Sequence, residues 1–365
     1  MAKMGIQQML QERNLPPLKS REEMKEILLE KMYGKMPDTA YEVSVSEPRD
    51  VQMSFCEGTA GPSTVDMTVT TEYGSHTFPV YRFLHEDGKK RPLFIHVDFQ
   101  AGQPTLRCPS EEIADRGFDV ISFCYTDVQP DYAVWDKGLA TVMFPPKARE
   151  EHENMAGKIS LWAWAASRVL DYALTLPSVD AENVAVIGHS RLGKTALVAG
   201  MMDERFKYVI SNDSGCCGAA LERGGTGVLK TPGPYGQCGE PLEYLAKNVP
   251  SWFAPNFLKY ANTNVQDGFD QHYLLATIAP RHLYVASGSM DDWADPNSEF
   301  LATCAASEMW EKQGLVGLVH DDRLPDNIAT YQEGGVAYHR RHGKHVLSRY
   351  DWNKYMDYIL RHLDD

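Results

Sequence analysis

The stretch that most constrains this chain is residues 184–195, Val-Ala-Val-Ile-Gly-His-Ser-Arg-Leu-Gly-Lys-Thr. Its four leading apolar residues predict a short strand without a polar face, as in a sheet that is covered on both sides. From Thr195 onward the sequence favours a helix. Ser190 then occupies a tight turn between strand and helix, where the first free backbone N–H groups of the helix point. This placement predicts a serine held as a nucleophile.

The same residues also fit a second motif. Gly188, followed after four residues by Gly193-Lys194-Thr195, satisfies the P-loop pattern, in which a glycine-rich turn cradles phosphates. The nucleophile turn is usually Gly-x-Ser-x-Gly, and here Leu192 stands two positions after the serine. A P-loop strand usually leads its domain, whereas two strands of parallel type are predicted before residue 184. The order of elements therefore disfavours the P-loop, although residues 208–213 could supply its acidic strand.

The order of predicted elements indicates an α/β protein. The first part of the chain predicts strands, including a hairpin across Gly74-Ser75, and strands and helices then alternate. The predicted strands are residues 41–45, 51–55, 65–71, 76–83, 92–97, 118–125, 184–187, 208–211, 282–287 and 336–339, and the predicted helices are 21–35, 158–176, 297–313 and 350–362. We expect a doubly wound, mostly parallel sheet with an antiparallel N-terminal edge, in a single domain over residues 1–365. Residues 1–36 are expected to form a helical extension, and residues 214–265 an irregular insertion near the active site.

Charge and composition exclude several partners. Acidic residues outnumber basic ones, 50 against 36, and no basic run suits nucleic acid. The most apolar helix, residues 161–176, is interrupted by Arg168 and Asp171 and is too short to span a bilayer. The N-terminus lacks the apolar segment of a signal peptide, so we expect a cytoplasmic protein, or an exported one if a leader was trimmed. The sequence does not indicate an oligomeric state.

The seven cysteines are odd in number and share no repeated spacing, which favours reduced thiols over a disulfide framework. Cys216 and Cys217 are adjacent, and we expect them to be small buried residues.

A nucleophilic serine needs an acid and then a histidine later in the chain. His345 precedes the last predicted helix, where the final loop of such a sheet returns to the serine. Asp291 follows the strand at 282–287, with Asp295 close by, and Asp213 follows the strand at 208–211. All three aspartates could instead form turns or cap helices. A zinc site formed by His339, His342 and His345 is disfavoured because no acidic or cysteine ligand flanks these histidines.

The motifs resemble those of the glucuronoyl esterases, carbohydrate esterase family 15, many of whose bacterial members carry Gly-His-Ser-Arg-x-Gly-Lys. Residues 188–194 match that pattern in full. The likeness extends over roughly residues 15–365 and includes 269–272 (Phe-Asp-Gln-His), 278–281 (Ile-Ala-Pro-Arg), 291–296 (Asp-Asp-Trp-Ala-Asp-Pro) and 343–345 (Gly-Lys-His). Most members are exported. Two positions depart from the family: Asp213 stands where a longer Glu is common, and residues 236–240 match the sugar-binding loop only in part.

The resemblance implies an α/β-hydrolase fold and gives each candidate residue a role. Ser190 would be the nucleophile and His345 the base, with Asp213 or Asp291 as the orienting acid, and Arg191 would help to hold the oxyanion. Lys194, Glu240 and Trp293 would bind the sugar.

The expected activity is hydrolysis of carboxylic esters of small carbohydrates, most plausibly 4-O-methyl-glucuronoyl esters on xylan fragments, without a cofactor or metal. An acetyl xylan esterase or a general carboxylesterase is the alternative, and a P-loop nucleotide-binding protein is a remote one. Of the candidate acids, Asp291 is favoured over Asp213, because the strand before it carries the acid in most hydrolases of this architecture.

Overall fold

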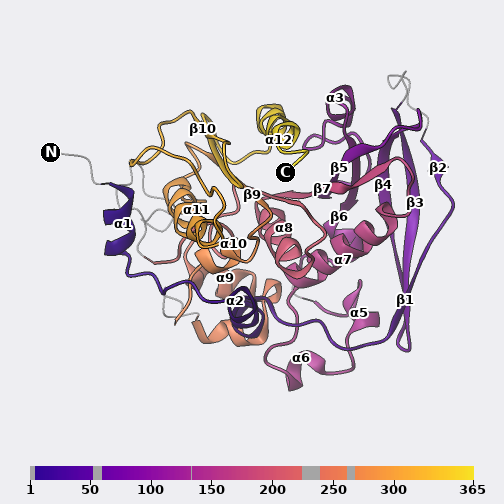
Figure 1. Cartoon of the computed structure of the whole chain (residues 1–365). Helices are drawn as coiled ribbons and strands as arrows, with labels where there is room; N and C mark the ends of the chain where they lie inside the picture. Colours follow the sequence, from indigo (N-terminus) through magenta and orange to yellow (C-terminus); the bar gives the residue numbers. More distant parts are fainter. Residues whose placement is uncertain (1–4, 52–59, 133, 224–238, 261–267) are drawn as a thin grey trace.

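The computed structural model describes residues 5–51, 60–132, 134–223, 239–260 and 268–365. These residues form one 11-stranded sheet, in the order β1-β3-β4-β6-β5-β7-β8-β9-β11-β10, with β2 paired to β3 (Figure 1). The strands are β1 (Tyr41–Val45), β2 (Arg49–Asp50), β3 (Ala60–Thr71), β4 (Gly74–His85), β5 (Arg91–Asp98), β6 (Asp119–Cys124), β7 (Val179–His189), β8 (Tyr208–Asn212), β9 (His282–Gly288), β10 (Ala329–Tyr331) and β11 (Val336–Arg341).

The centre of the sheet is parallel and its N-terminal edge is antiparallel, as predicted. Strands β6, β5, β7, β8, β9 and β11 pair in parallel, and β1, β3 and β4 form the antiparallel edge. A second antiparallel pair, β10 with β11, was not predicted, because β10 is only three residues long. The hairpin turn lies at residues 72–73, two residues before the predicted Gly74-Ser75, since Thr71 already pairs with Gly74.

Helices cover both faces of the sheet, because neighbouring residues of each central strand point to opposite sides. Val186 belongs to the cluster on the face covered by α7 (Lys158–Ala173), α8 (Arg191–Met202) and α11 (Pro296–Glu311). Its neighbours Ala185 and Ile187 belong to the cluster on the other face, under α3 (Ser110–Asp115) and α12 (Arg349–Arg361). Figure 1 shows α12 and α3 apart from α7 and α8. The doubly wound arrangement is therefore confirmed.

The N-terminal extension is helical as expected, although in pieces: α1 (Ile6–Glu12), α2 (Arg21–Leu28) and a π-helical turn, η1 (Leu29–Tyr33). Ser20 and Glu23 form the capping box that starts α2. The π-turn ends at Gly34, whose φ of 83° and close contact with the Met155 carbonyl exclude a side chain.

The predicted insertion at 214–265 is more ordered than expected in its described part. It contains α9 (Leu242–Asn248) and the short 3-10 helices η2 (Pro250–Trp252) and η3 (Pro255–Tyr260), and α10 (His272–Ala276) follows it. Residues 224–238 and 261–265 lie outside the described residues, as does most of the strand predicted at 51–55. The remaining helices are the short α4 (Tyr125–Val128), α5 (Ala140–Met143) and α6 (Ala148–Glu151).

Candidate active site

Ser190 is the single residue between β7 and α8, because the strand ends at His189 and the helix begins at Arg191. Its backbone has φ 58° and ψ −129°, a conformation that costs a non-glycine residue free energy. The amide of Ser190 donates to the carbonyl of Asn212 at the end of β8, 2.8 Å away. The turn therefore lifts the serine side chain out of the sheet at its carboxyl edge.

Two glycines allow this turn to be so tight. A side chain at Gly188 would place its Cβ 2.0 Å from the Leu192 carbonyl oxygen. At Gly193 a Cβ would lie 3.0 Å from the Ser214 side chain, so this position is where α8 approaches the end of β8. Leu192 instead points into the core and is fully buried. The glycine of the usual motif is thus displaced by one position because α8 approaches β8 at residue 193.

The same geometry excludes a P-loop. One residue joins the strand to the helix, so no glycine-rich loop of free amides is left to cradle phosphates. Gly193 and Lys194 already donate their amides to the Ser190 carbonyl. Lys194 is also buried, and its ammonium donates to the Ser214 carbonyl at 2.7 Å.

His345 and Asp291 form a direct pair. His345 Nδ1 donates to Asp291 Oδ2 over 2.6 Å. The residues follow β11 and β9, which are parallel neighbours, so their loops meet at the same edge of the sheet. The His345 ring lies 4.4 Å, centroid to centroid, from that of His189, the residue before the serine. In the described part of the chain Ser190 Oγ makes no hydrogen bond, and the His345 side chain is 41% exposed.

Asp213 lies behind this pair and is held by other partners. One of its carboxylate oxygens accepts from the Gly288 amide at 2.5 Å, and the other from Arg341 at 2.7 Å. Burial raises the pKa of Asp213, whereas the Arg341 guanidinium lowers it. A carboxylate oxygen of Asp213 is within 4.8 Å of a ring nitrogen of His345, yet the hydrogen bond goes to Asp291.

The other candidate residues near His345 have partners or positions that serve the fold, not the site. Asp295 caps α11, with its carboxylate accepting from the Ser298 amide at 3.0 Å and hydroxyl at 2.7 Å. His339 is fully buried between Asp351 and the Tyr284 hydroxyl, and His342 is exposed beside Ser289. The histidines at 339, 342 and 345 therefore do not converge on one ion.

Arg191 is held by a carboxylate and an indole that the sequence reasoning missed. Its guanidinium donates to Asp131, which also accepts from Trp252 Nε1 at 2.5 Å and from the Tyr125 hydroxyl at 3.0 Å. The guanidinium carbon lies 4.7 Å from the centre of the Trp252 ring. Asp131 follows the end of β6 and α4, so a search for acids beyond the carboxyl ends of the strands could have found it. Trp252 lies in the insertion, and no sequence pattern pointed to it as a site residue.

Lys194, Glu240 and Trp293 lie together, although they come from α8, from the insertion and from the loop after β9. Glu240 accepts from Lys194 at 3.5 Å through one oxygen and from Trp293 Nε1 at 3.2 Å through the other. The Trp293 ring also packs edge-on against Tyr244, with centroids 5.1 Å apart. Three polar groups and an aromatic surface thus meet beside the serine turn, a combination suited to a hydroxyl-rich ligand.

The assembled groups suit acyl transfer. The strained Ser190 turn lies beside a histidine whose Nδ1 is occupied by a carboxylate, which leaves Nε2 available to accept a proton. The amide after the serine lies in the first turn of α8 and has no acceptor within the helix, and the Arg191 side chain adds a cation nearby.

Comparisons with known proteins agree with this chemistry. The family profile described as fungal glucuronyl esterase matches residues 150–314. A solved glucuronoyl esterase from Solibacter usitatus is 31% identical with a TM-score of 0.79, and the match covers 94% of this chain and 92% of that one. A promiscuous esterase of carbohydrate esterase family 15, from a marine bacterial metagenome, is 27% identical with a TM-score of 0.81, covering 94% and 91%.

Among curated proteins, a 4-O-methyl-glucuronoyl methylesterase from Sodiomyces alcalophilus is 33% identical over 50% of this chain but only 34% of its own length. These comparisons give no support to the expected cytoplasmic location. No helix in the described part of the chain has both the length and the apolar character needed to cross a membrane.

The α/β-hydrolase fold predicted from the motifs is confirmed by the solved relatives. The chain belongs to the glucuronoyl esterases of carbohydrate esterase family 15 and is a carboxylic ester hydrolase.

Proposed function

We propose that this protein hydrolyses 4-O-methyl-glucuronoyl esters of the kind that link glucuronoxylan to alcohols, with Ser190 as nucleophile. The observation that carries the proposal is the 2.6 Å contact between Asp291 and His345 beside the strained turn of Ser190. The Sodiomyces relative, named a 4-O-methyl-glucuronoyl methylesterase, supports the acyl half of the substrate.

In the proposed reaction Ser190 Oγ attacks the ester carbonyl carbon while its proton passes to Nε2 of His345. Asp291 keeps the other ring nitrogen protonated and stabilises the imidazolium that forms. The Arg191 side chain and the Arg191 amide stabilise the negative oxygen of the tetrahedral intermediate. The alcohol leaves with the proton from His345, and water, activated by the same histidine, then releases the uronic acid and restores the serine.

The sugar is proposed to lie against Trp293, with its hydroxyl groups near Lys194 and Glu240. These two residues are linked at 3.5 Å, so they offer a donor and an acceptor side by side. The arginine that holds the oxyanion would be kept in place by Asp131 and Trp252. An enzyme for a polysaccharide ester fits export better than the cytoplasm, so we favour the exported alternative.

The second candidate is a broader carboxylesterase that also accepts acetyl esters of xylan. The specific support is the family 15 relative whose name describes it as promiscuous.

Initial rates on methyl 4-O-methyl-glucuronate and on acetylated xylo-oligosaccharides would separate the two. We expect kcat/KM on the uronate ester to exceed that on the acetyl ester by at least about 100-fold, since only the uronate carries hydroxyls in its acyl half that can meet buried polar partners. Comparable values would favour the broad esterase, and no hydrolysis of either ester would contradict both.

A further inference from the structure

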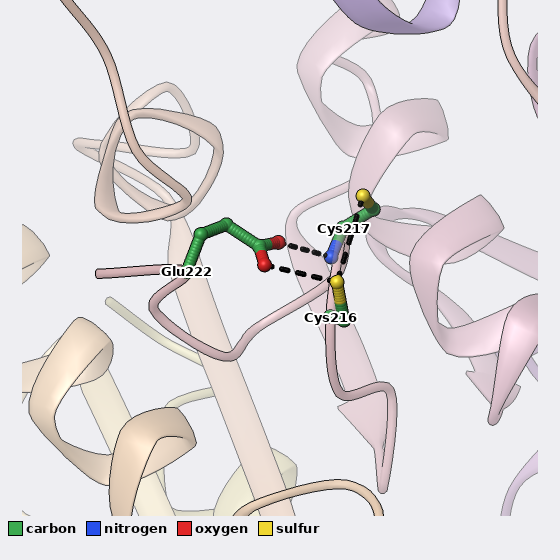
Figure 2. A group of neighbouring side chains, drawn as sticks. All are labelled: Cys216, Cys217 and Glu222. Atoms are coloured by element: carbon green, nitrogen blue, oxygen red, sulfur yellow. Dashed lines mark hydrogen bonds between the residues drawn. The ribbon is translucent and has the colours of Figure 1, made fainter. Parts of the chain in front are cut away.

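A second group of reactive side chains, to which the proposed ester hydrolysis gives no role, lies in the segment that follows β8. Cys216 and Cys217 are 3% and 0% exposed, and the carboxylate of Glu222 turns back toward them (Figure 2). Cys216 Sγ donates to Glu222 Oε2 at 2.9 Å, and the two sulfur atoms are 3.9 Å apart. One ligand atom of each residue lies within 4.8 Å of the other two. We call these three residues the dithiol cluster.

The spacing of the two sulfurs fits a tetrahedral metal. Zinc–sulfur bonds of about 2.3 Å at a tetrahedral angle place two thiolates about 3.8 Å apart. The observed Sγ–Sγ distance of 3.9 Å is within about 0.1 Å of that value, whereas a disulfide requires about 2.05 Å. The sulfur–oxygen distance of 2.9 Å is that of a hydrogen bond, and it would open to about 3.5 Å when a metal replaced the thiol proton.

The backbone around the cluster is already organised to hold these ligands. Glu222 Oε1 accepts from the Cys217 amide at 2.6 Å, which fixes the carboxylate and leaves Oε2 facing the sulfur. The Tyr33 hydroxyl donates to the Cys217 carbonyl at 3.0 Å. Cys217 itself has a φ of 53°, which cysteine seldom adopts, and this turn places both adjacent sulfurs within reach of one carboxylate. Hydrogen-bonded support of this kind is typical of metal ligands.

Burial keeps the groups of the cluster protonated, so a metal would have to displace their protons. Burial raises the pKa of Cys217 to about 12 and that of Glu222 to about 8, so the groups hold their protons in the absence of a metal. The other described cysteines, Cys108, Cys124 and Cys304, have no carboxylate hydrogen-bonded to them within the described ranges.

We propose that Cys216, Cys217 and Glu222 bind one thiophilic divalent cation of the zinc type, with a fourth coordination position left open. On binding, the two thiols, and Glu222 where it is protonated, release their protons to solvent, and the metal forms two bonds to sulfur and one to oxygen. None of these three ligands has a role in the proposed ester hydrolysis, although Lys194 and Glu240 lie close enough to influence their pKa values.

The test is a titration of the full chain, reduced and freed of metal, with Cd²⁺ as the spectroscopic probe and Zn²⁺ as the competitor. We expect a cadmium–thiolate charge-transfer band that saturates at one ion per chain and is displaced by Zn²⁺. Loss of a group that only supports a metal ligand costs about 10–100-fold in affinity, so loss of a ligand in Cys216→Ser or Cys217→Ser should cost at least about 100-fold.

Two further variants sharpen the assignment. Glu222→Gln keeps the side-chain shape and an acceptor for the Cys217 amide but removes the charged ligand, so it should weaken binding while the thiolate band persists. Cys304→Ser removes another buried thiol elsewhere and should leave affinity unchanged. Circular dichroism checks that each variant is folded.

A wild-type protein that shows no saturable band overturns the proposal, and this result needs no variant. Equal affinity in the wild type and in the Cys216→Ser/Cys217→Ser double variant would likewise overturn it, by placing the ion elsewhere.

Discussion

The two sides of the candidate ester site are built in different ways. The reacting side comes from the ends of parallel strands at one edge of the sheet: Ser190 after β7, Asp291 after β9 and His345 after β11. The binding side joins the start of α8 to distant loops, in the Arg191–Asp131 and Lys194–Glu240 pairs. The sheet thus positions the reacting groups, whereas ion pairs between α8 and distant loops position the groups that meet the substrate. Changes on the reacting side should therefore lower kcat, and so should changes to Arg191, which is proposed to hold the oxyanion. Changes at the sugar contacts Lys194 and Glu240 should act mainly on KM.

The largest effect should come from Ser190→Ala. Without the hydroxyl no acyl-enzyme forms, and a drop of about 10⁶-fold in kcat is expected. Steady-state rates on a methyl glucuronate ester measure the loss, and an unchanged circular dichroism spectrum is the control. Retention of more than a small fraction of wild-type activity would remove Ser190 from the reacting side.

The second-largest effect is expected for Asp291→Asn. Its kcat should fall by about 10⁴-fold, because the amide stabilises the wrong tautomer of His345. Asp213→Asn is the matched comparison. Asp213 and Arg341 are a buried pair, so removal of one charge should lower the free energy of unfolding by about 3 kcal/mol. We expect kcat to fall far less in Asp213→Asn than in Asp291→Asn. Denaturant unfolding and kcat measured on both variants decide the matter, and the reverse pattern would assign the acid to Asp213.

Arg191→Ala should lower kcat by about 10²–10³-fold, as loss of an oxyanion donor does. Asp131→Asn tests whether the binding side positions this arginine, and it should give a smaller fall in kcat, in the same direction. The two effects should not add in the double variant, because Asp131 is proposed to act through Arg191. Additive effects would show that Asp131 acts independently.

Lys194→Ala should raise KM by about 10–100-fold, the value of a lost charge-assisted hydrogen bond, with a smaller change in kcat. Glu240→Gln keeps the acceptor for Trp293 and should raise KM less. Full saturation curves on the uronate ester measure both parameters. A fall in kcat at constant KM would move Lys194 to the reacting side.

The smallest effect concerns the strain in the serine turn. A non-glycine residue at φ 58° and ψ −129° costs about 1–3 kcal/mol, and glycine escapes this cost while losing about 0.5–1 kcal/mol to backbone entropy. Ser190→Gly should therefore be more stable than Ser190→Ala by about 1 kcal/mol in denaturant unfolding. Both variants lack the nucleophile, so the difference reports only the backbone. Equal stability would mean that the turn relaxes without cost.

The sequence by itself determined the reacting side to a large extent. The apolar run before Gly188 and the helix after Ser190 are local signals, because side-chain periodicity and turn sterics act over a few residues. The alternation of strands and helices made a parallel sheet predictable, and such a sheet brings the ends of its strands to one edge. The order of serine, acid and histidine in the chain then narrowed the acid to a few aspartates.

Only the tertiary structure decided which groups meet. Asp131 and Arg191 are 60 positions apart, and Asp291 and His345 are 54 apart, so no local pattern links them. Asp213 and Asp291 differ in their partners. Arg341 binds the carboxylate of Asp213, whereas the carboxylate of Asp291 accepts the hydrogen bond of His345. Gly193 stands one position beyond the usual motif because α8 approaches the end of β8 there. These contacts arise from the way separate loops pack against each other, and that packing is a property of the whole chain.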